Sequence, residues 1–258
     1  MSVLISGSVA ARARRNYKPR KTAMLLAQRI VSEITERGLE PGVMLPPEQE
    51  MLTEYGVARG TLREALRYLE SQGVLTIKPG PRGGPVVTSP DPRYLASTLA
   101  LLMQVTGAPY RTVVEARQIV EPAMAARAAA LVTDEQLDEL RASVERMAEV
   151  LDSLPDFLEE NRAFHDLISH ISGNQLFEHL LASLGWITDG TALGVDYPKR
   201  SRQQVLDVHR SILEAIEQRD PALAESRMRE HIDAYVAYLQ RHYKQLLDRQ
   251  LRWENVWS

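Results

Sequence analysis

The chain has 258 residues, of which 44% are hydrophobic and 25% charged, and its formal net charge is −3. This length and balance are typical of globular material that forms one large or two modest domains. The chain has no cysteine, which excludes disulfide bonds and thiolate metal sites. Its first arginines follow a short apolar stretch instead of preceding it, and no apolar run reaches the length of a membrane span. We therefore expect a cytoplasmic protein without a membrane partner.

The charged residues are unevenly distributed along the chain. Residues 1–90 contain 13 Lys or Arg and 8 Asp or Glu, whereas the remaining residues contain 18 and 26. A basic N-terminal third joined to an acidic remainder is typical of a protein in which one part meets phosphate and the other does not. Chance unevenness on solvated faces explains the same numbers equally well, so the choice depends on the motifs.

The chain begins with a basic stretch and two expected helices. Residues 1–20 hold five basic side chains with little periodicity, which we interpret as a flexible arm. This arm either touches a phosphate backbone or is only a disordered end. From Thr22 apolar residues recur at helical spacing, and Gly38 ends that helix. Pro47 begins a second, short helix, where its missing N–H costs nothing.

The next helix, expected from about Gly60 to Ser71, is the most informative element. A tight turn at 55–57 separates it from the short helix before it. Its buried stripe leaves Arg59 at its start, and Thr61 and Arg63 on other faces. A helix that carries basic and hydroxyl side chains, set by a turn against a first helix, fits a DNA major groove. The expected stripe consists of Leu62, Ala65, Leu66 and Leu69.

A β-hairpin is expected behind this helix. Residues 75–77 and 86–88 are short apolar runs that can pair, with a tip rich in Gly, Pro and Arg between them. Such a hairpin would make a wing beside the DNA phosphates. We therefore predict a winged helix-turn-helix domain over residues 21–88, followed by a linker at 89–92, where prolines discourage helix.

Everything beyond the linker has helical periodicity, and no convincing strand pattern is present. We predict an antiparallel all-helical bundle over 93–247, so the protein as a whole is mostly α. Ile119 with Ala123, and Leu213 with Ile216, are expected to face its core. The expected helices lie at 93–106, 110–131, 134–151, 156–171, 174–190, 201–219 and 221–247, with a tail at 248–258.

Three of the six histidines can meet inside this bundle. His209 and His231 each lie 11 residues from Asp220, where a turn is expected, so an antiparallel hairpin places them at one level. Asn161 and His165 are four residues apart and share a helix face. Imidazole nitrogens suit zinc, nickel and similar ions, and three of them leave positions open for a ligand or water. The alternative is three buried histidines satisfied by neighbouring groups or a bound anion.

These motifs together resemble the GntR family of bacterial transcription regulators, specifically its FadR-like branch with an all-helical effector-binding (FCD) domain. The resemblance covers about residues 22–240. In the N-terminal part it rests on PG-x-x-LP-x-E at 41–48, on YGVAR at 55–59, on TLREAL at 61–66 and on LESQG at 69–73. In the C-terminal part it rests on RQIVE at 117–121, N-x-x-FH at 161–165, SGN at 172–174, VH at 208–209 and EHI at 230–232.

The resemblance implies which residues contact DNA. Arg59, Thr61 and Arg63 would contact bases or phosphates, and Gly80 in the wing would approach the minor groove. Arginine suits this role because its fork can bind guanine O6 and N7 together. Gln49 stands where many members carry an arginine, so its contact would be weaker.

The resemblance also implies a metal site. Many members of the branch bind a divalent ion through an Asp or Asn and three histidines, which correspond here to Asn161, His165, His209 and His231. Asn161 is a neutral and weaker donor than the Asp of other members. Zinc or nickel is the expected ion.

Arg117 resembles the arginine with which this branch grips its effector. A guanidinium near a metal can clamp a carboxylate bidentately while the metal takes a second oxygen. The alternative is a structural ion pair with Glu121, four residues later.

We therefore expect a metabolite-responsive regulator and not an enzyme. It would bind a near-palindromic double-stranded operator as a homodimer, and a small carboxylate metabolite would release it from repression. The alternative is a metal-dependent hydrolase using the three histidines. That alternative lacks a general base, because Asp166 is expected to lie on a different helix face. A purely architectural DNA binder would not need so large a second domain.

Overall fold

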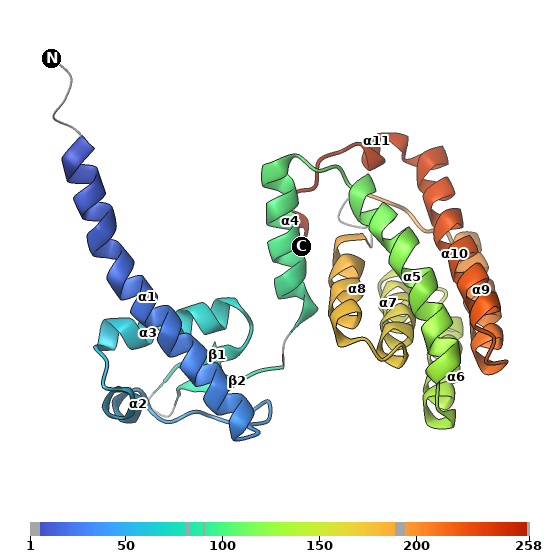
Figure 1. Ribbon diagram of the computed structural model, residues 1–258. Helices are drawn as coiled ribbons and strands as arrows, with labels where there is room; N and C mark the ends of the chain where they lie inside the picture. Colours follow the sequence, from blue (N-terminus) through green and yellow to red (C-terminus); the bar gives the residue numbers. More distant parts are fainter. Residues whose placement is uncertain (1–5, 81–82, 90, 189–193, 257–258) are drawn as a thin grey trace, which may run out of the picture. The chain divides into compact units, whose positions relative to one another are not determined.

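The computed structural model describes residues 6–80, 83–89, 91–188 and 194–256, with side chains from Lys21 onward except that of Asn255 (Figure 1). The chain forms two compact units, Met1–Tyr94 and Leu95–Ser258. The predicted linker at 89–92 ends two residues before this division, and its Pro90 lies outside the described residues. The fold is mostly helical, as predicted. Among the described residues, no helix combines the length and the apolar character needed to span a bilayer.

The N-terminal unit contains three helices and a hairpin of two antiparallel strands. These are α1 (Ser6–Glu36), α2 (Glu48–Tyr55), α3 (Arg59–Ser71), β1 (Leu75–Ile77) and β2 (Pro85–Val87). α2 ends at Gly56, whose φ of 61° is a left-handed conformation that glycine adopts without strain, and the chain then turns into α3. Leu75 pairs with Val87 and Ile77 with Pro85, so the second strand begins one residue earlier than predicted.

α1 begins well before Thr22, where the sequence predicted its start. It runs through most of residues 1–20, which were predicted to be a flexible arm, and residues 1–5 lie outside the described part. Alanine and arginine are frequent in this stretch and are both strong helix formers, which accounts for the helix. Among the described side chains of α1, Ala23 is the first that is buried.

The core of the N-terminal unit lies between α1, α3 and the hairpin. Ile30 of α1, Met51 of α2 and Leu75 of β1 are all buried in it. From α3 the core takes the predicted stripe, so the opposite face of this helix lies at the surface. The buried residues of α3 are Leu62, Ala65, Leu66 and Leu69.

The C-terminal unit is a helix bundle (Figure 1). It consists of α4 (Pro92–Thr106), α5 (Arg111–Leu131), α6 (Asp134–Glu149), α7 (Leu154–Ile171), α8 (Gln175–Thr188), α9 (Lys199–Glu217), α10 (Pro221–His242), α11 (Lys244–Leu247) and the 3₁₀ helix η2 (Trp253–Val256). α5 is central, because it contacts α7, α8, α9 and α10. The helix predicted at 221–247 is interrupted at Tyr243, and the predicted end of another, at 190, lies outside the described residues.

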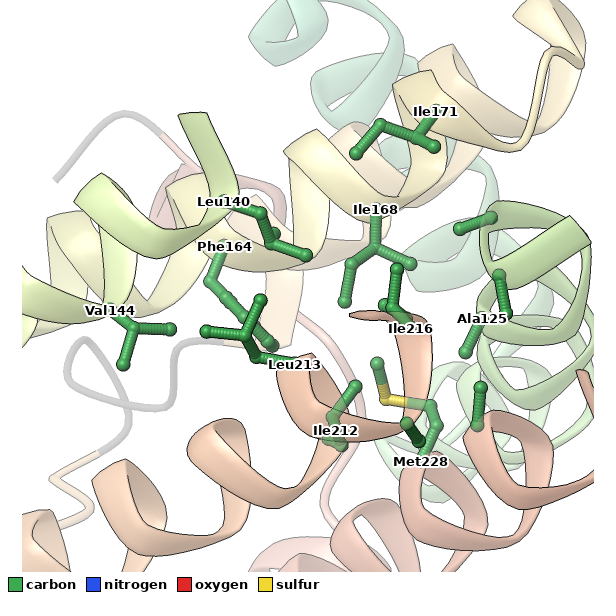
Figure 2. Close-up of a cluster of buried hydrophobic side chains, with 14 of the residues drawn as sticks. Ala125, Leu140, Val144, Phe164, Ile168, Ile171, Ile212, Leu213, Ile216 and Met228 are labelled. Atoms are coloured by element: carbon green, nitrogen blue, oxygen red, sulfur yellow. The ribbon is translucent and has the colours of Figure 1, made fainter. Parts of the chain in front are cut away.

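Figure 2 shows the main core of the bundle, where apolar side chains from several helices meet. Leu213 and Ile216 are buried in it, as predicted. Ile119 and Ala123 were predicted to face the core as well, and this is wrong, because Ile119 is 73% exposed and Ala123 also lies at the surface. α5 carries apolar residues on both sides, so its periodicity does not identify the buried face. The buried face of this helix includes Glu121.

The last residues, predicted to be a tail at 248–258, pack against the bundle as far as they are described. Leu251 and Val256 are buried. The backbone N–H of Trp253 donates a hydrogen bond to Gln104 Oε1 of α4 at 2.7 Å. The segment is too short for periodicity to reveal a buried side, so the sequence did not distinguish it from a free end.

Candidate functional site

Three imidazole rings converge inside the bundle. His165 comes from α7, His209 from α9 and His231 from α10, and all three are buried. The Nε2 atoms of His209 and His231 are 3.2 Å apart, and those of His231 and His165 are also 3.2 Å apart. The structure thus brings together the three histidines that the sequence singled out, with one ligand atom of each lying within 4.8 Å of the others.

The turn between α9 and α10 sets two of these histidines at one level. Asp220 caps α10 by accepting a hydrogen bond from the N–H of Leu223 at 3.0 Å, and Pro221 occupies the first turn, where it needs no N–H. His209 and His231 each lie 11 residues from Asp220. At the rise of an α-helix both are therefore carried about 16 Å along the hairpin.

The spacing of the three nitrogens fits a metal ion. Two ligands bound at about 2.0–2.1 Å to a tetrahedral ion lie about 3.3 Å apart. Two of the three separations, from His231 to His209 and from His231 to His165, are 3.2 Å, and the ligand atoms of all three lie within 4.8 Å of one another. A neutral ring nitrogen carries either one proton or one lone pair, so His231 Nε2 can make its two contacts by hydrogen bonding only if it shares that proton or lone pair between them. An ion bound by the Nε2 atoms would account for both contacts without such sharing.

Glu121 lies behind this cluster and holds one of its rings. Its Oε2 atom is 2.6 Å from Nδ1 of His165, and its Oε1 atom forms an ion pair with Nε of Arg117. Burial alone would raise the pKa of Glu121, but Arg117 and His165 outweigh it and hold that pKa well below its usual range. An ionised carboxylate at Nδ1 favours a proton on that nitrogen, which directs the lone pair of Nε2 toward the other two rings.

Burial also keeps the other two histidines neutral. Desolvation lowers the pKa of His231 to about 3, and it lowers the pKa of His209 well below its ordinary value. Phe164 stacks on the ring of His209 with 4.0 Å between ring centroids, which fixes the plane of that imidazole. Neutral imidazole is the form that binds metal ions, so His209 and His231 are in the required state.

A cavity of about 190 Å³ adjoins the histidines. His165 and His231 lie in its wall, as does Asn161, which is half-buried one turn before His165 on α7. Most of the remaining wall is apolar or aromatic, with a few polar groups, as in sites that bind small molecules. The polar residues include Arg162, Asp166, Thr188, Ser201 and Gln204, and the wall also contains Tyr197, Tyr235 and Tyr238.

Arg117 fits both interpretations that the sequence left open. It is ion-paired with Glu121, and it also lies in the wall of the cavity, where 13% of its side chain is exposed. Its Nη1 atom donates a hydrogen bond to Thr188 Oγ1 at 2.8 Å. The guanidinium is thus held in a fixed orientation beside the histidine cluster.

Asp166 was expected to lie on a different helix face from His165, yet both line the same cavity. The cavity follows a wide strip of α7, so residues one position apart reach it from either side. Burial raises the pKa of Asp166, against the lowering effect of His165 and Arg162. The guanidinium carbon of Arg162 lies 3.9 Å from the centroid of the Trp186 ring, a cation–π contact.

A second candidate surface lies on the N-terminal unit. Arg59 begins α3 and Arg63 follows one turn later, with side chains 60% and 56% exposed. Both approach the carboxylate of Glu48, with Arg59 Nε 3.2 Å from one oxygen and Arg63 Nε 3.2 Å from the other. Thr61 is half-buried between them, and Gln49 is exposed on α2. The basic side chains therefore lie at the surface, as a DNA contact requires.

The hairpin continues this surface. A groove of about 370 Å³ separates α3 from the wing, with Arg63 and Arg67 on one side and Lys78 and Gly80 on the other. Gly80 is exposed, and its φ of 106° is a conformation that residues with a side chain rarely adopt. Glu70 joins the two sides, because its Oε1 accepts a hydrogen bond from the N–H of Ile77 at 3.1 Å.

Sequence reasoning gave no site role to Glu48 or Glu121. Glu48 was read only as part of a family motif, and Glu121 only as a structural partner for Arg117. The spacing from Arg117 to Glu121, four residues on one helix, was the available signal for the second. A role for Glu48 could be recognised only from the packing of α2 against α3, which no local sequence pattern predicts.

Two protein families match the two units. Residues 23–83 match the family described as bacterial regulatory proteins, gntR family, and residues 112–234 match the FCD domain. The matched segments contain α3 with its arginines in the first case and all three clustered histidines in the second.

Whole-chain relatives agree with this assignment. An uncharacterized HTH-type transcriptional regulator of Bacillus subtilis, YcbG, is 29% identical over 83% of this chain and 88% of its own length. The HTH-type transcriptional repressor NanR of Escherichia coli K12 is 27% identical over 82% and 85%. The structure of a Streptococcus agalactiae GntR superposes with a TM-score of 0.63 at 26% identity, covering 83% of this chain and 98% of that one. These relatives are regulators, which sets the hydrolase alternative aside. The chain belongs to the GntR family, in the FadR-like branch with an FCD domain, and is a DNA-binding transcription regulator.

Proposed function

We propose that this regulator is a repressor whose affinity for its operator falls when a small carboxylate metabolite binds beside a divalent metal in the FCD domain. One observation carries the proposal: Arg117 and two of the clustered histidines, His165 and His231, lie in the wall of a single cavity. NanR, one of the relatives, is itself a repressor. Because the target is bacterial operator DNA, the protein would act in the cytoplasm.

The metal would be held by His165, His209 and His231, with the amide oxygen of Asn161 as a further donor. Zinc or nickel suits these nitrogen donors. When bound, the ion supplies a coordination position for one oxygen of the effector. Glu121 would keep His165 in the tautomer that binds.

Arg117 would bind the carboxylate of the effector. Its Nε and Nη1 atoms are engaged by Glu121 and Thr188, which fixes the guanidinium while its outer edge remains for an incoming anion. Thr188 ends α8, and its carbonyl oxygen accepts hydrogen bonds from Tyr110 and Tyr235 at 2.9 Å each. An effector at Arg117 would thus act on the junction of α5, α8 and α10. It would shift the equilibrium between the DNA-binding conformation and the released conformation only as far as it binds the released one more tightly.

At the DNA, we assign contacts to Arg59, Thr61 and Arg63 of α3, to Gln49 of α2 and to Gly80 of the wing. Exposure of both arginines and the groove between α3 and the wing support this assignment. Two copies would bind as a homodimer, each with its α3 in the major groove of one half-site of a near-palindromic operator.

The test uses a duplex recovered from a randomised library by the full chain. With zinc bound, one member of a panel of small carboxylates should lower the affinity for this duplex by about 5- to 150-fold. Chelation, or His165→Ala, should abolish this response. His170→Ala is the matched control, because His170 lies on the same helix but is exposed and pairs with Glu178. If no carboxylate changes either DNA affinity or the melting temperature of the zinc-loaded protein, the proposal is wrong.

A further inference from the structure

We propose that Glu48 is a positioning residue for DNA recognition, whose carboxylate holds Arg59 and Arg63 so that both present their outer nitrogens to base edges. The inference rests on the proposed role of these two arginines in DNA contact. It adds a residue that would touch no base itself and would act only through them.

The geometry is that of one carboxylate shared by two guanidiniums. Oε1 of Glu48 lies 3.2 Å from Nε of Arg59, and Oε2 lies 3.2 Å from Nε of Arg63. Glu48 is the first residue of α2, whereas both arginines belong to α3. Its side chain is 34% exposed, and those of the arginines are 60% and 56% exposed. The anchor is thus more buried than the groups it holds.

The choice of atoms matters for recognition. Both arginines approach Glu48 through Nε, and among the described residues no hydrogen bond uses their terminal Nη atoms. The pair of Nη atoms at the end of each guanidinium therefore remains for a bidentate contact with guanine O6 and N7. Arg59 and Arg63 are four residues apart on one helix, so the two forks point from the same face.

Holding the side chains in this way has two effects on binding. An arginine that is already oriented loses less conformational freedom when it meets a base, so the specific complex gains affinity. The carboxylate also cancels one of the two positive charges, which weakens attraction to phosphates of any sequence. Both effects raise the ratio of specific to non-specific affinity.

A simpler role for Glu48 is to stabilise the N-terminus of α2, where an acidic side chain interacts favourably with the helix dipole. The chain offers a matched control for this role. Glu50 lies in the same first turn of α2 and is exposed. In the described part of the chain it has no ion pair with either arginine. Glu50→Gln removes the same charge from the same turn without touching Arg59 or Arg63.

The experiment measures the affinity of the full chain for two duplexes, one recovered from a randomised library by the wild-type protein and a shuffled version of it. Glu48→Gln should weaken binding to the recovered duplex by about 5- to 50-fold. Its binding to the shuffled duplex should stay the same or strengthen. Glu50→Gln should change both affinities by the same small factor. The effect of Glu48→Gln should also disappear when Arg59 and Arg63 are both replaced by Ala.

The outcomes separate this proposal from the assignment on which it rests. Equal ratios of specific to non-specific affinity in wild type, Glu48→Gln and Glu50→Gln would overturn the role of Glu48 alone. So would a parallel loss on both duplexes with a lower melting temperature, which indicates a structural role. If Arg63→Ala and Arg59→Ala each leave binding to the recovered duplex unchanged, the arginine assignment fails and the role of Glu48 fails with it.

Discussion

Replacing Glu121 by Gln should weaken both the fold and the proposed metal site of the FCD domain. Glutamine has nearly the same shape but no charge, so the guanidinium of Arg117, of which only 13% of the side chain is exposed, loses its buried counter-ion. Nδ1 of His165, which now faces a carboxylate oxygen at 2.6 Å, would face a neutral amide. If the amide nitrogen turns toward that ring, His165 must move its proton to Nε2, the atom that is needed for the metal.

The size of the effect follows from these contacts. Removing one partner of a buried ion pair costs about 3–5 kcal/mol, because the other charge is left uncompensated. Thr188 Oγ1 still accepts from Arg117 at 2.8 Å. The amide oxygen can also accept from Arg117, so we expect the lower end, about 3 kcal/mol. For a domain of this size the melting temperature should fall by about 6–12 °C. Loss of the group that orients a metal-binding histidine should weaken zinc binding about 10- to 100-fold.

Scanning calorimetry of chelator-treated protein measures the fall in melting temperature, and competition with a zinc-binding dye measures the loss of zinc affinity. The control is Glu178→Gln, since Glu178 also contacts a histidine, His170 Nδ1 at 3.2 Å, but at an exposed position. That variant should melt within about 2 °C of wild type and keep its zinc affinity. The reasoning is refuted if Glu121→Gln behaves like the control in both measurements.

Three further predictions concern other parts of the molecule. Chelator-treated protein should lose stability as the pH falls below about 6.5, by up to about 1.4 kcal/mol per pH unit for each of His209 and His231. The reason is that burial lowers the pKa of His231 to about 3 and also lowers that of His209, so between pH 6.5 and these lowered values these imidazoles are protonated only in the unfolded chain. Urea denaturation that shows no loss of stability over this range would contradict the prediction. Arg63→Ala should cost about 1–3 kcal/mol of affinity for the recovered duplex with little change for a shuffled one, as a binding titration would show. Ile212→Ala, in the fully buried core, should lower the free energy of unfolding by about 2–5 kcal/mol, and a smaller loss in urea denaturation would mean that the core collapses around the gap.

The sequence predicted the features that depend on local patterns. The helix-turn-helix follows from the stripe of α3 and the turn at Gly56, and the meeting of His209 with His231 follows from their equal distance from Asp220. Both are matters of counting along regular helices. The second strand of the hairpin was predicted one residue too late, because both 85–87 and 86–88 are apolar enough to pair with 75–77.

The sequence did not predict burial correctly for a helix that is apolar on several faces, or for a segment too short to show periodicity. α5 is central and contacts α7, α8, α9 and α10, so apolar residues occur around most of it, and Ile119 was assigned to the core although it is exposed. The C-terminal end buries Leu251 and Val256 through contacts with helices far away in the chain. Burial of this kind depends on which elements meet, and a periodicity within one element does not contain that information.

The two residues that sequence reasoning overlooked are alike in chemistry. Glu48 contacts Arg59 and Arg63, and Glu121 contacts Arg117 and His165, so each carboxylate holds two nitrogen-bearing side chains that are assigned to a ligand. A search for groups that touch DNA or an anionic effector selects positive charge and passes over carboxylates, which would repel both. Yet a guanidinium or imidazole that must point in one direction needs an acceptor behind it. In this chain the acceptor for His165 lies on another helix, as does the acceptor for the arginines of α3. The spacing of Arg117 and Glu121 could be seen in the sequence, but these two contacts between helices become visible only when the helices are packed together.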